Sequence, residues 1–272
     1  MGLNTRLRSG FQAWLALAEG PRAAMQLGAL VAGAPVLGAL SPRPDVDQPV
    51  LVIPGFLADD DSTWILRTFL DGLGYSVYPW EMGTNLGVSA MGGYEPLVRK
   101  LTDIHRQHER KVALVGWSLG GVHALAVAHR AGYAVSQVVT LGSPLRPAQS
   151  ADEDTLLYSG LKATAARLNP ALDASRSTLE RWRNALLSLP DDLPVTSIYS
   201  RTDAVVPWQR SRLDTQSCRE NIEVVAGHIG LGVSPAVFFA VADRLAQPPG
   251  SFNHFEINGL RNFWYPPQKS SK

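Results

Sequence analysis

The sequence predicts an α/β fold in which a mostly parallel central sheet is flanked by helices. Short apolar, β-branched stretches alternate along the chain with longer amphipathic ones, which is typical of parallel sheets covered on both faces. One predicted strand runs straight into a helix through a glycine-rich turn. Several polar residues directly follow predicted strands, where the ligand site of such a sheet lies. With 272 residues and 45% hydrophobic content, the chain can bury one core of ordinary size.

The elements follow from the spacing of the apolar residues. We expect strands at residues 49–53, 75–80, 111–115, 135–141, 194–199 and 221–225. We expect helices at residues 62–73, 94–109, 122–129 and 235–246. The first of these helices should begin at Asp61 or Ser62 as N-cap. Its inward side chains should be Trp64, Leu66, Phe69 and Leu70.

This pattern divides the chain into four parts. Residues 1–48 form an N-terminal helical segment, and residues 49–144 and 194–246 form the α/β core. Residues 145–193 break the alternation and predict a helical cap inserted over the site, with packing against the domain as the alternative. Residues 247–272 form a tail whose aromatic side chains predict docking onto the domain or a partner.

Composition excludes several classes of partner. The net charge is +1 and no basic stripe occurs, so we expect no nucleic-acid partner. The one cysteine, Cys218, excludes an intrachain disulfide, and no zinc-like spacing of Cys and His occurs. We expect the N-terminal helices to cover the domain or the mouth of its site. Peripheral contact with a membrane and a cleaved signal are the alternatives, and the default location is the cytoplasm.

The most informative stretch is the turn between the third predicted strand and its helix. It reads Gly116-Trp117-Ser118-Leu119-Gly120, which is the G-x-S-x-G pattern of a nucleophile elbow. In such a turn a strained serine presents its hydroxyl at the carboxyl edge of the sheet. The alternative is a glycine-rich turn whose serine only caps the helix. The strand before the turn and the helix after it favour the elbow, so Ser118 is the candidate nucleophile.

A serine nucleophile requires a base and a group that orients the base. Asp203 and His228 each follow a predicted strand, so both should lie at the same edge as Ser118. Their order along the chain, Ser, Asp and then His, is the order expected after this elbow. We therefore predict Ser118 as nucleophile, His228 as general base and Asp203 as the carboxylate that holds the His228 tautomer.

The remaining site residues follow from the same edge. The Leu119 N–H and the Phe56 N–H, with Leu57 as second choice, should form the oxyanion hole. Leu57, Trp117 and Trp208 are candidate walls of a substrate pocket, and Asn85 is a candidate polar contact. The alternative for the aromatic side chains is ordinary core packing.

These motifs together resemble those of the α/β-hydrolase superfamily, and within it the bacterial lipases and esterases. The matching segments are Pro54-Gly55-Phe56, the turn around Ser118, Asp203 in SRTDAVVP and His228 in GHIGL. The chain departs from the family pattern at Pro54, where many lipases have a histidine. It also has helical sequence where two early antiparallel strands are expected.

The resemblance implies hydrolysis of a small-molecule or lipid-like carboxylic ester through an acyl-enzyme, without metal or cofactor. Two alternatives stay open. One is an acyltransferase or thioesterase that uses the same three residues, and the other is a receptor-like homologue that only binds its ligand. The sequence does not indicate the oligomeric state.

Overall fold

A computed structural model describes residues 3–146, 159, 160, 163, 167, 189–214, 217–248 and 250–267. Most of the predicted helical cap, residues 145–193, lies outside the described residues.

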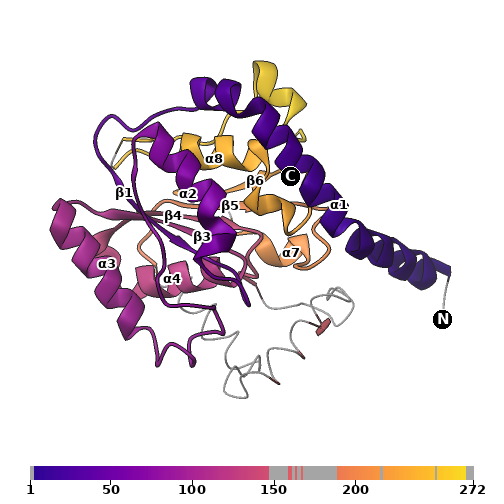
Figure 1. Cartoon of the computed structure of the whole chain (residues 1–272), viewed down its shortest axis with the longest axis horizontal. Helices are drawn as coiled ribbons and strands as arrows, with labels where there is room; N and C mark the ends of the chain where they lie inside the picture. Colours follow the sequence, from indigo (N-terminus) through magenta and orange to yellow (C-terminus); the bar gives the residue numbers. More distant parts are fainter. Residues whose placement is uncertain are drawn as a thin grey trace.

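The centre of the molecule is a six-stranded parallel sheet. Its strands are β1 (Pro49–Ile53), β2 (Ser76–Tyr78), β3 (Val112–Trp117), β4 (Val135–Leu141), β5 (Val195–Tyr199) and β6 (Arg219–Glu223). Their order in the sheet is β2-β1-β3-β4-β5-β6, and every neighbouring pair is parallel. After β1 the chain forms β2 at one edge of the sheet and then crosses to the other side of β1 to form β3. From β3 it adds β4, β5 and β6 in sequence toward the other edge (Figure 1). All six strands end at the same edge, which brings the loops that follow them together.

Helices cover both faces of the sheet (Figure 1). The long helices are α1 (Leu3–Leu40), α2 (Trp64–Leu73), α3 (Glu95–His108), α4 (Leu119–Ala131) and α8 (Pro235–Leu245). The short helical turns are η1 (Asp60–Thr63), η2 (Gly132–Ala134), α7 (Trp208–Ser211), η4 (Gly230–Gly232) and η5 (Gly259–Phe263). One hydrophobic cluster joins α1, α2 and α8 to the sheet, and a second joins α3 and α4 to its opposite face.

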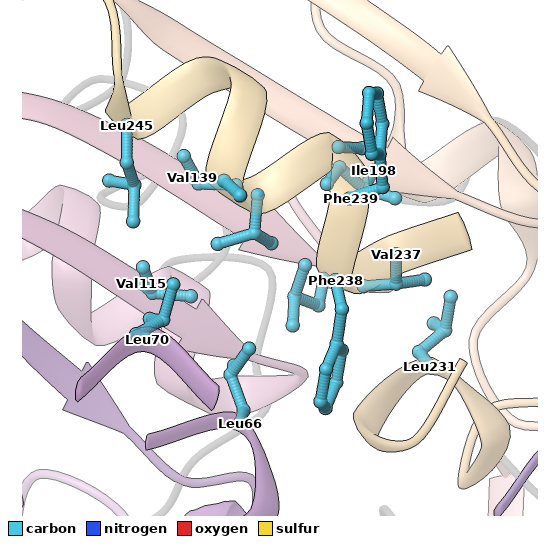
Figure 2. Packing of buried hydrophobic residues seen from close by; sticks show 14 of the residues in the cluster. Leu66, Leu70, Val115, Val139, Ile198, Leu231, Val237, Phe238, Phe239 and Leu245 are labelled. Carbon is cyan, nitrogen blue, oxygen red and sulfur yellow. The ribbon is translucent and has the colours of Figure 1, made fainter. Parts of the chain in front are cut away.

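The alternation of side chains along each strand creates these two clusters. In β1, Val50 and Val52 belong to the first cluster, whereas Leu51 and Ile53 belong to the second. Successive side chains of a strand point to opposite faces, so a strand buried on both faces must be apolar throughout. Figure 2 shows the first cluster, in which Phe238 of α8 packs over the sheet beside Leu66 and Leu70 of α2.

The N-terminal segment forms one long helix, where the sequence predicted more than one. The helix α1 continues through Pro21 and Pro35. Each proline removes one backbone hydrogen bond at a cost of about 3 kcal/mol, which the contacts of α1 with the domain must offset. Leu30 and Leu37 of α1 are buried against α2 and α8. This helix therefore forms part of the covering of the sheet.

The C-terminal tail docks on α8. The Tyr265 hydroxyl donates to the Ala236 carbonyl over 2.6 Å, and the Tyr265 ring meets Phe255 edge to face at 4.7 Å between centroids. Both rings are almost fully buried. Of the two readings of the tail, docking onto the domain is the one that these contacts support.

Three local predictions were wrong. Trp64 is 59% exposed and does not face the core. Asp59, rather than Asp61 or Ser62, caps the first turn, because its carboxylate accepts from the Asp61 N–H. The last strand begins two residues earlier than expected, at Arg219. Its first two residues, Arg219 and Glu220, are charged, so the sequence did not indicate a buried strand there. In the structure both are buried, and their charged groups bond to other groups of the protein interior.

Candidate active site

Ser118 lies in a sharp turn between β3 and α4. Its backbone has φ 54° and ψ −120°, a conformation that costs roughly 1–3 kcal/mol for a residue with a side chain. Its N–H donates to the Leu141 carbonyl at the end of β4 over 2.8 Å. The strained turn and its hydrogen bond fix Ser118 at the carboxyl edge of the sheet.

Two glycines make this turn possible. A Cβ atom on Gly116 would overlap the backbone of Gly120 and Gly121. A Cβ atom on Gly120 would overlap the carbonyl oxygens of Ile53 and Pro54. The strand and the helix therefore approach each other and β1 more closely than any side chain would allow, as the G-x-S-x-G pattern requires.

His228 and Asp203 form a buried hydrogen-bonded pair. The distance from His228 Nδ1 to Asp203 Oδ2 is 2.7 Å. A carboxylate can only accept, so Nδ1 carries the proton and Nε2 is left with a free lone pair. The other oxygen of Asp203 accepts from the backbone N–H groups of Val205 and Val206, each over 2.8 Å. These bonds hold the carboxylate in one orientation toward the imidazole.

The electrostatics of the pair suit a general base. Burial alone disfavours the charged imidazolium. The negative charge and hydrogen bond of Asp203, and the charge of Glu19, outweigh burial and raise the pKa of His228 above its ordinary value of 6.5. A base with a raised pKa holds a proton more strongly when it receives one.

The Asp203–His228 pair adjoins the turn that carries Ser118. A Cβ atom built on Gly142, the residue after Leu141, would lie 3.0 Å from Asp203 Oδ2 and 3.3 Å from His228 Nδ1. Trp117, which precedes Ser118, donates from Nε1 to the His228 carbonyl over 3.2 Å. Its ring centroid lies 6.2 Å from that of His228. Three segments distant in sequence therefore meet at one edge.

The hydroxyl of Ser118 makes no hydrogen bond with His228 in the described part of the chain. Such bonds are often long before a substrate binds, and they close in the reacting complex. All three side chains are nonetheless largely buried, since Ser118 and His228 are each 7% exposed and Asp203 is 5% exposed.

The loop after β1 lies against Ser118. A Cβ atom on Gly55 would be 3.2 Å from Ser118 Cβ and 3.9 Å from Ser118 Oγ. Neither the Phe56 N–H nor the Leu119 N–H donates to another group within the residues described. The Leu57 N–H, by contrast, donates to the Asn85 carbonyl over 2.9 Å. Of the two candidates in this loop, Phe56 therefore keeps its donor available and Leu57 does not.

Asn85, the predicted polar contact, lies behind the loop after β1. It is fully buried, and its amide nitrogen donates to the Pro54 carbonyl over 2.8 Å. Its side-chain oxygen accepts from the Gly87 N–H and pairs with His123 Nε2 at 3.2 Å. Because these atoms are used inside the protein, the contacts of Asn85 favour a supporting role over the predicted contact with substrate. It holds the Pro54–Leu57 loop from behind.

His123 and Tyr94 extend this support. Burial lowers the pKa of His123 to about 4, so the ring is neutral at ordinary pH. Asn85 offers His123 an acceptor, so Nε2 is the protonated nitrogen and Nδ1 accepts from the Tyr94 hydroxyl over 3.2 Å. The sequence predicted that His123 packs against its surroundings. The sequence did not predict its connection, through Asn85, to the loop after β1.

The candidate pocket walls differ in their surroundings. Leu57 is 44% exposed and stays a predicted wall. Trp117 packs on the His228 loop, as described above. Trp208 stacks on Tyr199, and the Arg201 guanidinium lies 4.3 Å from the centre of its ring. These contacts favour a packing role for Trp208, which was the alternative to a pocket wall.

One residue near the pair was missed by sequence reasoning. Glu19 of α1 accepts from the Ala204 N–H over 3.1 Å and from the Ile229 N–H over 3.2 Å. These donors directly follow Asp203 and His228, so one buried carboxylate holds both loops. The available signal was that Glu19 is the only acidic residue in the first 40.

Comparison with known proteins gives structural neighbours alone. No family model matches the chain, and no curated protein matches its sequence. A pyrethroid hydrolase is 17% identical, with a TM-score of 0.50 over 74% of this chain and 98% of its own. A Bacillus licheniformis lipase is 14% identical, with a TM-score of 0.50 over 74% and 94%. Lipase B of Aspergillus fumigatus is 18% identical, with a TM-score of 0.51 over 79% of this chain but 58% of its own.

Proposed function

We propose that this chain, which has the α/β-hydrolase fold of its structural neighbours, is a serine hydrolase that cleaves carboxylic esters. The observation that carries the proposal is the buried Asp203–His228 hydrogen bond beside the strained turn of Ser118. The names of the neighbours, which include lipases and a pyrethroid hydrolase, agree with ester chemistry.

The proposed reaction begins with proton transfer. His228 Nε2 takes the Ser118 proton while Ser118 Oγ attacks the ester carbonyl carbon. Asp203 stabilises the imidazolium that forms. The carbonyl oxygen becomes an oxyanion that accepts from the Phe56 and Leu119 N–H groups. Each such donor contributes roughly 3 kcal/mol to transition-state stabilisation.

The tetrahedral intermediate then collapses. The bond to the alcohol oxygen breaks, and His228 returns its proton to that leaving oxygen. Water repeats the sequence on the acyl-enzyme, with His228 again as base, and releases the acid and free Ser118. Each step transfers one proton and forms or breaks a bond at the carbonyl carbon without a change of oxidation state, so no oxidant or reductant is needed for balance.

The test compares two serines at the same edge. Ser118→Ala should lower kcat with p-nitrophenyl esters by about 10⁶-fold, and it should abolish covalent labelling by a fluorophosphonate. Ser143→Ala is the matched control, because Ser143 is a buried serine after β4 with no role in the mechanism. It should keep both activity and labelling.

Three outcomes would contradict ester hydrolysis. Labelling of Ser118→Ala would show that another residue is the nucleophile. A stable acyl-enzyme that forms from the ester but is released only by an added alcohol or thiol would indicate an acyltransferase. Saturable binding of esters without turnover would indicate a receptor. A series of rising acyl chain length, run on the wild-type protein, defines the size of the acyl group accepted.

A further inference from the structure

The charged residues of α1 between Leu17 and Leu40 lie on the side that faces the protein, not on the side that faces solvent. Between Leu17 and Leu40 the only charged residues are Glu19 and Arg22. Glu19 is buried between two loops, as described above. The Arg22 guanidinium donates to the carbonyl and hydroxyl oxygens of Thr202 over 2.9 and 2.6 Å. Both charges are therefore directed into the protein.

The outward face of this segment carries no charge. Its large exposed side chains are Leu17, Met25, Leu27, Val31, Val36 and Leu40. Met25 is 76% exposed and Val31 is 68% exposed. The other exposed positions between Leu17 and Leu40 are alanine, glycine and proline. A helix on the surface of a soluble domain normally places charged and polar residues outward, so this face is not built for water.

The helix lies along the domain. Glu19, Leu30 and Leu37 are buried on its inner side, and these contacts extend over about 27 Å at 1.5 Å per residue. Figure 1 shows α1 running beside α8, with its amino-terminal end projecting past the rest of the molecule. The segment Leu17–Leu40 is long and apolar enough to cross a bilayer by length and composition. Its inner side packs on the domain, however, so the helix as folded offers its outer side to a membrane and would lie along the membrane surface.

The apolar surface continues to the candidate active site. Val225 and Ile229 are 63% and 49% exposed. Val225 is joined to α1 through its carbonyl, which accepts from Gln26, and Ile229 is joined through its N–H, which donates to Glu19. Ile229 follows His228 directly. Exposed apolar side chains therefore lie both on α1 and next to His228.

We propose that the outward face of α1 docks flat on a lipid bilayer, with Val225 and Ile229 at the edge of the contact. The chemistry of the face favours lipid over a protein partner. Protein interfaces depend on a few aromatic or arginine anchors, and the exposed positions between Leu17 and Leu40 include neither. Binding to a bilayer grows with the apolar area buried in it, and this face is apolar along its length. The proposal is independent of the ester chemistry.

The experiment measures flotation of the full chain with vesicles of phosphatidylcholine and phosphatidylglycerol. The wild-type protein should float with the vesicles in a density gradient. The double variant Met25→Glu and Val31→Glu should bind at least about tenfold more weakly, because two carboxylates must then enter the interface. Tyr133→Glu is the matched control. Tyr133 is 65% exposed, but it packs on His105 of α3 at the opposite face of the sheet. This control should bind like the wild type.

Each result of the flotation experiment supports or overturns docking of α1 on a bilayer. Thermal unfolding of both variants verifies that the fold is kept, and fluorophosphonate labelling reports the serine site separately. A wild-type chain that stays at the bottom of the gradient overturns the proposal. Equal flotation of the double variant also overturns it. A wild-type dimer that the double variant turns into a monomer, with no flotation of either, would assign the face to a second copy of the chain.

Discussion

At the scale of single residues, Glu19 shows how a side chain outside the sheet can control the candidate site. Its carboxylate accepts from the residues that follow Asp203 and His228, so it fixes the spacing of the two loops. Its charge is also one of the causes that raise the pKa of His228. Glu19 is thus a positioning residue with two separable effects, one on geometry and one on proton affinity.

Replacing Glu19 with glutamine should separate these effects. The glutamine oxygen can accept one N–H, but its amide group faces the other donor, so one buried N–H loses its acceptor at a cost of about 1–3 kcal/mol. We expect kcat to fall about tenfold with little change in KM. Loss of the negative charge should also lower the pKa of His228. Because the neutral base is the active form, the acid limb of the kcat/KM profile should move to lower pH.

Glu19→Asp provides the control for this prediction. It keeps the charge while it shortens the reach, so its acid limb should stay where it is in the wild type even if kcat falls. An unchanged acid limb in Glu19→Gln, measured over the same pH range with the same ester, would leave Glu19 with a purely structural role.

The residues differ in how well the sequence predicted them. Ser118, Asp203 and His228 stood out because each follows a strand and belongs to a motif with a mechanical reason. Asn85, His123 and Tyr94 did not, because their task is to hold a loop by hydrogen bonds between segments about 30 positions apart. No local pattern encodes such a contact.

At the scale of elements, β3 and α4 depend on the absence of two side chains. The strand, its turn and the helix were predictable because the glycine spacing follows from the close approach of backbones. The first and last residues of these elements were harder to predict. The helix begins at Leu119, directly after Ser118, rather than at Val122. Gly120 and Gly121 lie in its first turn, and because glycine is a weak helix former the sequence predicted a loop there.

Two glycine-to-alanine substitutions test this view of the elbow. Gly120→Ala would force a methyl group onto the Ile53 and Pro54 carbonyls, which are backbone atoms that cannot rotate away. We expect a stability loss of about 1–3 kcal/mol from this overpacking, and loss of fluorophosphonate labelling. Gly132→Ala places its methyl group in open space at φ −56°. It should be neutral or stabilise by up to about 1 kcal/mol.

Urea unfolding of the three proteins measures both effects on one scale. Equal midpoints for wild type and Gly120→Ala would mean that β1 can withdraw from α4, and the elbow would then not be the rigid turn described here.

At the scale of the whole molecule, the ends of the chain reinforce the α/β core. The N-terminal helix ties together the loops of Asp203 and His228. The C-terminal tail closes the outer side of α8, whose inner side packs on the sheet. The aromatic residues of the tail predicted docking, but the site of docking depends on Glu220. That carboxylate is buried in β6 and accepts from Arg244 of α8 and from the Phe255 N–H.

Tyr265 tests whether the tail is an integral part of this fold. Tyr265→Phe removes only the hydrogen bond to the Ala236 carbonyl, which contributes about 1 kcal/mol. Tyr265→Ala also removes a ring that is 2% exposed and packed against Phe255, so it should cost about 3–5 kcal/mol.

The measurement for both variants is the unfolding free energy in urea, with Phe263→Ala as the control. Phe263 is 84% exposed in the same tail, so its loss should change the stability by less than about 0.5 kcal/mol. If Tyr265→Ala behaved like this control, the tail would be an appendage that leaves the core unaffected. A loss near the upper estimate would make the tail part of the same cooperative unit as the sheet, because the Tyr265 ring packs on Phe255, whose N–H donates to Glu220 of β6.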